Sequence, residues 1–156
     1  MGSYSFKSVG KTSVETKDQT LKKTLVPIGI ITPLRYGTNE GLFAMTFSLA
    51  DQVHYNLHDL IMTNWGERLG LYDFGANLKP LCADFNSPDD FDAEAIKRTN
   101  DAVAKWMSYV QLQDYISSTN TTNSNDLPNI VKIMITYNVV ALNVTNRTLE
   151  ISLRVL

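Results

Sequence analysis

The stretch from Asn56 to Leu78 constrains this chain most, because it carries the signals for the end of one helix, a turn and the start of another. Gly66 stands where a helix end favours a residue that tolerates a left-handed backbone. Gly70 and Gly75 then bracket a short aromatic connection. The apolar residues of the first helix recur at steps of three and four, which predicts one buried face. They are Leu49, Val53, Leu57, Leu60 and Ile61. We expect a helix, an elbow and a second helix.

Two further helices are predicted downstream of the elbow. Asn77 is expected to cap the first, with Pro80 in its first turn, where no backbone donor is missed. Its apolar positions are Leu78, Leu81, Cys82 and Phe85. Ser87 and Pro88 have the residue types of a cap and a first helical position, and the pattern continues to Trp106. The expected buried stripe of this longest helix is Ala95, Ile96, Thr99, Ala102, Val103 and Trp106.

Three strands are predicted after the helices, because apolar and polar residues alternate there. The first points Val110, Leu112 and Ile116 inward and is followed by a polar, mobile loop over residues 117–129. The second runs from Ile130 to about Val144, and residues 143–147 form the next turn. The inward residues of the second and third strands are Val131, Ile133, Ile135, Tyr137, Val139, Leu149, Ile151, Leu153 and Val155. The pattern predicts an α+β fold, with helices packed on one face of a small, mainly antiparallel sheet that ends in a C-terminal β-hairpin.

The N-terminal part has a different composition. Residues 1–24 are polar without a sustained period, and we expect an arm that is flexible or ordered by a partner. Residues 25–34 are apolar, but Pro27 and Pro33 restrict them to an extended segment. Residues 42–47 are a possible short strand, and Ser48 is a plausible cap for the helix that follows. Residues 25–156 are predicted to form one α+β domain.

Composition excludes several function classes. The formal net charge of −2 provides no basic field for nucleic acid or an anionic membrane. Cys82 is the only cysteine, so no internal disulfide is possible, and its apolar position favours a buried small side chain over a nucleophile. His54 and His58 have the i, i+4 spacing of a metal pair, with Asp51 three residues earlier, but they lie off the apolar stripe. We expect neither a metal nor another cofactor.

The elbow resembles a known family. The pattern Asn-Leu-x-x-Leu-x-x-Thr-x-x-Gly-Glu-Arg followed by Asp-Phe-Gly-x-x-Leu-x-x-Leu is similar to that of the baseplate wedge, or sheath-initiator, subunits of contractile phage tails. Related subunits occur in type VI secretion machines, and some members carry a lysozyme label. Twelve residues match in order across 26 positions. They are Asn56, Leu57, Leu60, Thr63, Gly66, Glu67, Arg68, Asp73, Phe74, Gly75, Leu78 and Leu81. The family's Glu-Pro-Arg after the long helix corresponds here to residues 107–109, which differ.

The resemblance implies a structural subunit that joins other wedge proteins, in several copies, and forms the template for the first sheath ring. The expected location is the virion tail baseplate, with assembly in the host cytoplasm. Residues Thr63, Gly66, Glu67, Arg68, Asp73, Phe74 and Gly75 would form the structural elbow, which Glu67 and Arg68 would tie by charge-assisted hydrogen bonds. The last strand has few charged residues to guard its edge, so we expect a sheath strand to pair along it. This predicted sheath-binding strand comprises Thr148, Glu150, Ile151, Ser152, Leu153, Arg154 and Val155.

A catalytic alternative stays open at this point. Glu67 and Asp73 could serve as the two carboxyl groups of a lysozyme-like peptidoglycan hydrolase. That chemistry needs one carboxyl group with a raised pKa and a groove that holds sugar rings. Arg68 next to Glu67 would instead favour the ionised form. The assembly role is therefore the preferred hypothesis, and we expect no enzymatic activity.

Overall fold

The computed structural model describes residues 26–37, 42–84, 88–117 and 130–154. The chain divides into two compact units, residues 1–55 and residues 56–156, and each is considered by itself. The predicted α+β class is confirmed, because the described ranges contain three helices and two small antiparallel sheets. The predicted arm, the expected positions of Phe85, Ser87 and Val155, and loop residues 118–129 lie outside these ranges. No helix within them is long and apolar enough to cross a bilayer.

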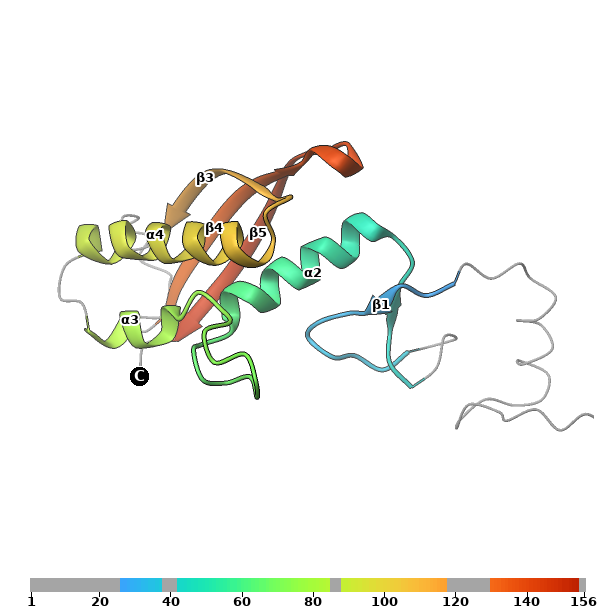
Figure 1. Cartoon of the computed structure of the whole chain (residues 1–156), viewed down its shortest axis with the longest axis horizontal. Helices are drawn as coiled ribbons and strands as arrows, with labels where there is room; N and C mark the ends of the chain where they lie inside the picture. Colours follow the sequence, from blue (N-terminus) through green and yellow to red (C-terminus); the bar gives the residue numbers. More distant parts are fainter. Residues whose placement is uncertain (1–25, 38–41, 85–87, 118–129, 155–156) are drawn as a thin grey trace, which may run out of the picture. The chain divides into compact units, whose positions relative to one another are not determined.

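The first unit contains a two-stranded sheet (Figure 1). Strand β1 (Gly29–Ile30) pairs antiparallel with β2 (Met45–Thr46), so the short strand predicted over residues 42–47 is confirmed in part of that range. Gln52 braces this hairpin, because its Oε1 accepts a hydrogen bond from Thr46 Oγ1 at 2.6 Å. The Gln52 side chain also occupies the space beside Gly29, where any Cβ atom would overlap it.

Helix α2 (Leu49–Met62) leads to the elbow. Its first turn closes where Gln52 N donates to the carbonyl oxygen of Ser48 at 3.0 Å, so the expected start is confirmed. Four of the five predicted core residues, Val53, Leu57, Leu60 and Ile61, are buried. Leu49 is 51% exposed, so its prediction as a core residue is wrong. It is the first residue of the helix, before the buried face begins.

Helices α3 (Leu78–Asp84) and α4 (Pro88–Trp106) follow the elbow. The predicted positions Leu78, Leu81, Ala95, Thr99, Ala102 and Val103 are buried. Ile96 was expected in the buried stripe, but it is 39% exposed. Phe91, which the pattern did not single out, is 4% exposed and belongs to the core. Ile96 lies beside a pocket between α4 and the sheet, which leaves one side of its side chain uncovered.

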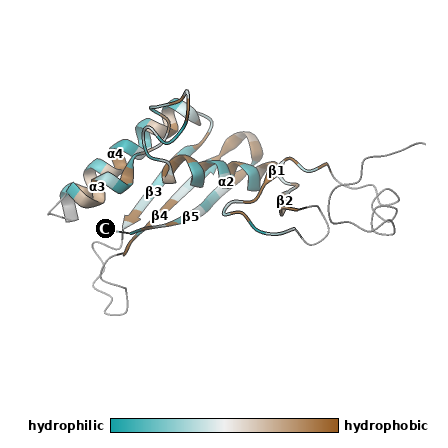
Figure 2. Cartoon of the chain, turned by 90° about the horizontal axis from the view of Figure 1, so that it is seen from below, coloured by the Kyte–Doolittle hydropathy of each residue, from teal (hydrophilic) through white to brown (hydrophobic). Residues whose placement is uncertain are grey.

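The main sheet has the order β3-β4-β5, formed by β3 (Gln111–Ser117), β4 (Ile130–Val139) and β5 (Val144–Arg154). All pairings are antiparallel, with Ile133 opposite Ile151 and Ile135 opposite Leu149. Helices α3 and α4 lie on one side of this sheet (Figure 2). The side chains on the helix-facing side form the core: Ile133, Ile135, Tyr137, Val139, Leu149, Ile151 and Leu153 are all at most 2% exposed. The predicted layering is therefore confirmed.

A bulge in β3 overturns the predicted alternation of the first strand. Leu112 pairs with Tyr137 and Asp114 with Thr136, so Gln113 has no opposite residue. An extra residue reverses which side chains face inward from that point. Ile116 is consequently 53% exposed, whereas Ser117 is 5% exposed. Ser117, predicted to begin the loop, is the last residue of β3, and its Oγ donates to Asp92 Oδ2 at 2.8 Å.

The turn between β4 and β5 lies earlier than predicted. Strand β4 ends at Val139, a short 3₁₀ turn η2 covers Val140–Leu142, and β5 already begins at Val144. Asn143 has φ 52°, and its N–H donates to the carbonyl oxygen of Val140 at 3.1 Å. Asparagine tolerates this left-handed conformation better than most residues, so the chain reverses there. The prediction of a turn over residues 143–147 is wrong.

Candidate functional site

The predicted elbow connects α2 to α3 through residues 63–77. Its three glycines all have positive φ, with 85° at Gly66, 79° at Gly70 and 110° at Gly75. Gly75 also lies against the end of α2, because a Cβ atom there would overlap the carbonyl oxygen of Thr63. Two backbone bonds join the same segments: Ala76 N donates to Leu60 O at 3.2 Å, and Asn77 N donates to Thr63 O at 3.3 Å. The elbow is therefore folded tightly onto the helix that precedes it.

Asn64 is the central hydrogen-bonding residue of the elbow. Its backbone N donates to Glu67 Oε2 at 2.8 Å, and its Nδ2 donates to Glu67 Oε1 at 2.8 Å. Its Oδ1 accepts a hydrogen bond from Lys79 N at 3.3 Å, in the first turn of α3. Asn64 thus caps a helix from 15 residues away, and it is only 9% exposed.

The expected capping role of Asn77 is wrong. Asn77 has φ 53°, whereas a residue at the N-cap normally has an extended backbone. Its Oδ1 accepts a hydrogen bond from Trp65 N at 3.4 Å instead. Asn77 therefore lies at the end of the elbow, and the backbone N–H of Lys79 at the start of α3 is bound by Asn64.

Glu67 and Arg68 contact different residues of the elbow. Glu67 binds Asn64, whereas the guanidinium of Arg68 lies 3.9 Å from the centre of the Phe74 ring. A guanidinium over an aromatic face is a favourable cation–π arrangement. The two charges therefore hold different parts of the elbow, Glu67 through hydrogen bonds and Arg68 through the ring of Phe74.

Helix α4 anchors the far side of the elbow. Asp73 forms an ion pair with Lys105, and the rings of Phe74 and Trp106 have centroids 5.2 Å apart. Trp65 Nε1 donates to the carbonyl oxygen of Gly75 at 3.0 Å, which closes the elbow internally. Asp73 and Phe74 were expected in the elbow, but their contacts with Lys105 and Trp106 of α4 were not predicted.

Arg98 of α4 also binds the elbow, and the sequence did not predict this contact. Its Nη1 donates to Asn77 O at 3.0 Å, while its Nε donates to Glu94 Oε1 at 2.8 Å. Its guanidinium also lies 5.7 Å from the centre of the Trp65 ring. The i, i+4 spacing from Glu94 signals the ion pair, but nothing local in the sequence indicates the contacts with residues more than 20 positions away.

Both candidate catalytic carboxyl groups are held in the ionised form. Hydrogen bonds from the backbone and then the side chain of Asn64 lower the pKa of Glu67 below its ordinary value. The hydrogen bond from Lys105 lowers the pKa of Asp73 in the same way. A general acid in a glycosidase needs a shift in the opposite direction. The surroundings of Glu67 and Asp73 therefore stabilise carboxylates that hold the structure together.

The tip of the elbow presents apolar side chains to solvent. Leu69 is 95% exposed, Tyr72 67%, Trp65 54% and Leu71 41%. These four residues are here called the elbow tip, and Trp65 is fixed by the hydrogen bond from its Nε1 to Gly75 O. Clustered exposed apolar residues on a defined scaffold are typical of surfaces that meet another protein.

The predicted sheath-binding strand coincides with β5, which is at one edge of the main sheet. Thr148, Glu150, Ser152 and Arg154 are exposed, whereas Ile151 and Leu153 point into the core. Strand β5 pairs with β4 on one side, and no strand in the described part of the chain pairs with its other side.

The histidine pair does not gather further ligands. His58 Nδ1 lies 3.3 Å from Asp59 Oδ1, and the His54 ring contacts Tyr55 edge-on. Within the described ranges, no three histidine, cysteine, aspartate or glutamate side chains are close enough to hold a metal ion. Cys82 is half-buried, and burial raises the pKa of its thiol, so it stays protonated.

Comparison with known proteins gives likeness at the level of the fold. Neither a protein-family model nor a curated protein sequence matches the chain. A chain of the anti-feeding prophage baseplate, solved with sixfold symmetry, is 20% identical with a TM-score of 0.56, over 70% of this chain and 82% of that one. A protein from Geobacter sulfurreducens, provisionally described as a tail lysozyme, is 20% identical with a TM-score of 0.58, over 72% of this chain and 97% of that one. The chain therefore has the α+β fold found in a baseplate component and in a tail-associated protein.

Proposed function

We propose that this protein is a structural subunit of a contractile tail baseplate, present in several copies in a symmetric assembly. The fold shared with a chain of a sixfold-symmetrised baseplate supports this role, as does the family resemblance of the elbow. In this proposal the protein resides in the virion tail, after assembly in the host cytoplasm. It joins other wedge proteins and forms the template on which the first sheath ring assembles.

The observation that carries the proposal is the position of β5 at the sheet edge. Its 11 residues are long for an edge strand, and they contain no proline. An incoming strand of the sheath protein would extend the sheet through main-chain hydrogen bonds. The exposed side chains of Thr148, Glu150, Ser152 and Arg154 would set its register, because alternate residues face the same side.

The opposite edge of the sheet is less suited to strand addition. Strand β3 has seven residues and carries the bulge at Gln113. A bulge bends the strand and interrupts the regular spacing of backbone donors and acceptors, which is one way that proteins protect an edge. The difference between the two edges favours β5 as the side that accepts the partner.

The elbow would serve the other contact, with wedge proteins. The elbow tip is apolar and exposed, while Asn64 and Glu67 hold its base rigid. A rigid surface loses little conformational entropy when it binds, so a small exposed cluster can contribute appreciable affinity. Leu69 at 95% exposure would be its most prominent anchor.

The geometry supports assembly over peptidoglycan hydrolysis. The two candidate carboxyl groups both have lowered pKa values, so neither is prepared to donate a proton at neutral pH. Each is also committed to a structural partner, Asn64 for Glu67 and Lys105 for Asp73. We propose that the protein is not an enzyme.

The test places proline at an outward position of β5. Ser152→Pro removes one backbone donor and keeps the buried residues intact, whereas the matched variant Ser152→Ala keeps the donor. Each variant would replace the wild-type chain in tails assembled in the host, and sheath length would be measured by electron microscopy. We expect tails without sheath for Ser152→Pro and normal sheath for Ser152→Ala.

Two controls separate this result from misfolding. Thermal unfolding of the purified Ser152→Pro chain must remain cooperative. Gln111→Pro, at the first residue of β3 and exposed, should leave sheath growth unchanged, because proline is tolerated where a strand begins. Full-length sheath on a folded Ser152→Pro protein would contradict strand addition along β5.

A further inference from the structure

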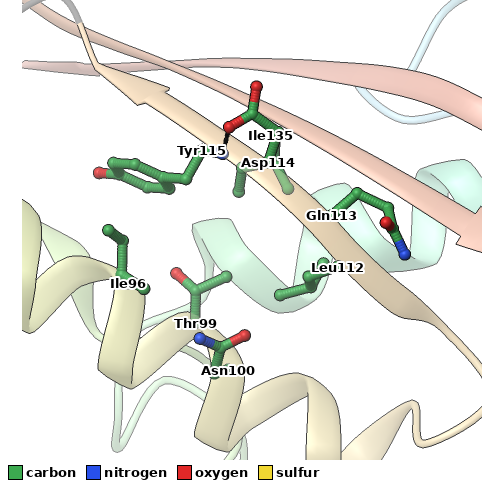
Figure 3. Close-up of a pocket in the computed structure, with 8 residues that line it drawn as sticks. All are labelled: Ile96, Thr99, Asn100, Leu112, Gln113, Asp114, Tyr115 and Ile135. Atoms are coloured by element: carbon green, nitrogen blue, oxygen red, sulfur yellow. Dashed lines mark hydrogen bonds between the residues drawn. The ribbon is translucent and has the colours of Figure 1, made fainter.

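A pocket of about 320 Å³ lies between α4 and the main sheet (Figure 3). Helix α4 contributes Ile96, Thr99 and Asn100 to its lining. Leu112 and Tyr115 contribute from β3, and Ile135 from β4. This volume is at the lower end of the range for pockets that bind small molecules.

The bulge at Gln113 explains which residues line the pocket. Because the bulge reverses the alternation, Tyr115 replaces Ile116 on the face that meets α4. Figure 3 shows the Tyr115 side chain extending from β3 above Ile96 and Thr99. Ile96 stays 39% exposed beside the opening. The alternation of β3 was expected to place Ile116 in the core. The bulge instead produces a recess with Tyr115 as its aromatic wall.

Two hydroxyl groups in this recess are buried without a hydrogen-bond partner. Thr99 is 1% exposed, and its Oγ1 has no partner among the described residues. The buried Oη of Tyr115 has none in the same part of the chain. Leaving a buried hydroxyl unpaired destabilises a protein, and native structures rarely do so without a reason. A ligand that supplies both a donor and an acceptor would satisfy these atoms.

Charge restricts what this ligand can be. Burial, followed by the negative charge of Asp92, raises the pKa of Tyr115, so its hydroxyl is neutral and able to donate. The same negative charge disfavours an anionic ligand. No carboxylate of the lining faces the recess to bind a cation, because Asp114 accepts a hydrogen bond from Tyr115 N at 2.9 Å and points away from α4 in Figure 3. Asp92 is not one of the lining residues, and its Oδ2 accepts a hydrogen bond from Ser117 Oγ at 2.8 Å. An ammonium group in the recess would therefore lose hydration without direct contact with a carboxylate.

We propose that this pocket binds a phenolic group, an aromatic ring that carries one uncharged hydroxyl. The ring would lie against Ile96, Leu112 and the ring of Tyr115, and its hydroxyl would pair with Thr99 Oγ1 and Tyr115 Oη. Two sources offer this chemistry, a tyrosine side chain presented by a neighbouring protein or a free small phenol. The site is independent of the proposed baseplate role, because none of its residues belongs to β5 or to the elbow.

The first test titrates the ¹⁵N-labelled full chain with p-cresol and, separately, with toluene, which has the same ring and methyl group without the hydroxyl. We expect saturable amide shifts for p-cresol at Thr99, Leu112 and Tyr115. Toluene should bind about 3- to 10-fold more weakly, since it makes no hydrogen bond to the buried hydroxyls. Equal binding of the two compounds, or no saturable shift with p-cresol, would overturn the proposal.

The second test removes one hydroxyl at nearly constant volume. Thr99→Val should weaken p-cresol binding about 3- to 10-fold and leave toluene binding unchanged or tighter. The matched control Thr148→Val, at an exposed position on β5, should bind both compounds like the wild type. Tyr115→Phe provides an independent variant if Thr99→Val unfolds. Unchanged p-cresol binding in a folded variant of either kind would count against the hydroxyl pairing.

A third titration distinguishes the two sources. N-acetyl-tyrosinamide carries the same phenol on a capped backbone, as in a protein side chain. Binding that shifts the same amides as p-cresol, and that Thr99→Val weakens, supports a tyrosine from a neighbouring protein. Failure of the capped tyrosine to shift those amides, while p-cresol does, overturns the protein source and assigns the site to a free phenol.

Discussion

Glu67 binds Asn64 through both carboxylate oxygens, one to the backbone N and one to Nδ2, each at 2.8 Å. The third polar group of Asn64, its Oδ1, accepts a hydrogen bond from Lys79 N at the start of α3. One buried asparagine therefore links the end of α2, the elbow and the next helix. This linkage explains how a connection with three glycines can support a defined apolar tip.

Gly75→Val should prevent stable folding or cost more than about 3 kcal/mol of unfolding free energy. The backbone at Gly75 has φ 110°, and a Cβ atom would lie 2.7 Å from the carbonyl carbon of Thr63 and closer still to its oxygen. Strain and overlap thus act together. Urea unfolding followed by circular dichroism measures the loss.

Gly66→Ala is the matched control for that substitution. Gly66 also has positive φ, but a Cβ atom there meets nothing within 4 Å. The cost should be limited to backbone strain, about 1 kcal/mol. A cost as large as that of Gly75→Val would contradict the role assigned to the contact with Thr63.

Asn64→Ala should lower the unfolding free energy by about 2–3 kcal/mol, because it removes two hydrogen bonds, one of them to a charged group, and leaves the Lys79 amide without its cap. Chemical denaturation measures the change. Asn77→Gly is the control, since it loses one long bond to Trp65 and gains freedom at a left-handed position. If both variants lost the same stability, the central role of Asn64 would be wrong.

Glu67→Gln should reduce stability at pH 7 by about 0.5–1 kcal/mol, a modest loss because the carboxylate is exposed to solvent. The folded-state pKa of Glu67 is lowered from its ordinary value of 4.5, so the ionised group stabilises the fold above pH 4.5. This contribution is lost as the pH falls through the folded-state pKa. The difference between wild type and Glu67→Gln should therefore shrink on acidification below pH 4.5, as measured by denaturation at several pH values. A difference that grows on acidification would contradict the assignment.

The same variant tests the catalytic alternative, together with Asp73→Asn. If the protein is structural, purified wild type and both variants should give the same background in a turbidity assay on cell walls. Lytic activity in the wild type that Glu67→Gln abolishes without unfolding would overturn the assembly role.

Arg98→Lys should destabilise the chain by about 1 kcal/mol even though the charge is kept. A single planar guanidinium contacts Glu94, Asn77 O and the Trp65 ring, and an ammonium group cannot reproduce that geometry. Lys97→Ala, at the exposed neighbouring position, should change stability by less than about 0.5 kcal/mol. Thermal unfolding compares the two variants, and an effect at Lys97 equal to that at Arg98 would argue against the proposed contacts.

Local pattern was sufficient to predict most elements of this protein. The alternation of β4 and β5 and most positions of the apolar repeats of α2 and α4 were predicted correctly, with Leu49 and Ile96 as exceptions. The reason is that burial of one face imposes a fixed period on the sequence. The glycines of the elbow were also recognisable, since a left-handed backbone restricts which residues are acceptable. These features depend only on neighbours within a few positions.

Tertiary structure decided everything that depends on distant residues. Helix α3 is capped by Asn64, 15 positions before the amide it binds, and no spacing rule indicates such a partner. The bulge at Gln113 inverts the end of β3 and creates the pocket, because register is fixed by the pairing strand and not by the strand's own alternation. The exposure of β5 at one edge likewise follows from the order β3-β4-β5, which is set by how three strands pack against α3 and α4. The sequence by itself determined the apolar repeats of the helices and strands and the glycine positions with a left-handed backbone. Contacts between groups far apart in the chain were decided only by packing in three dimensions.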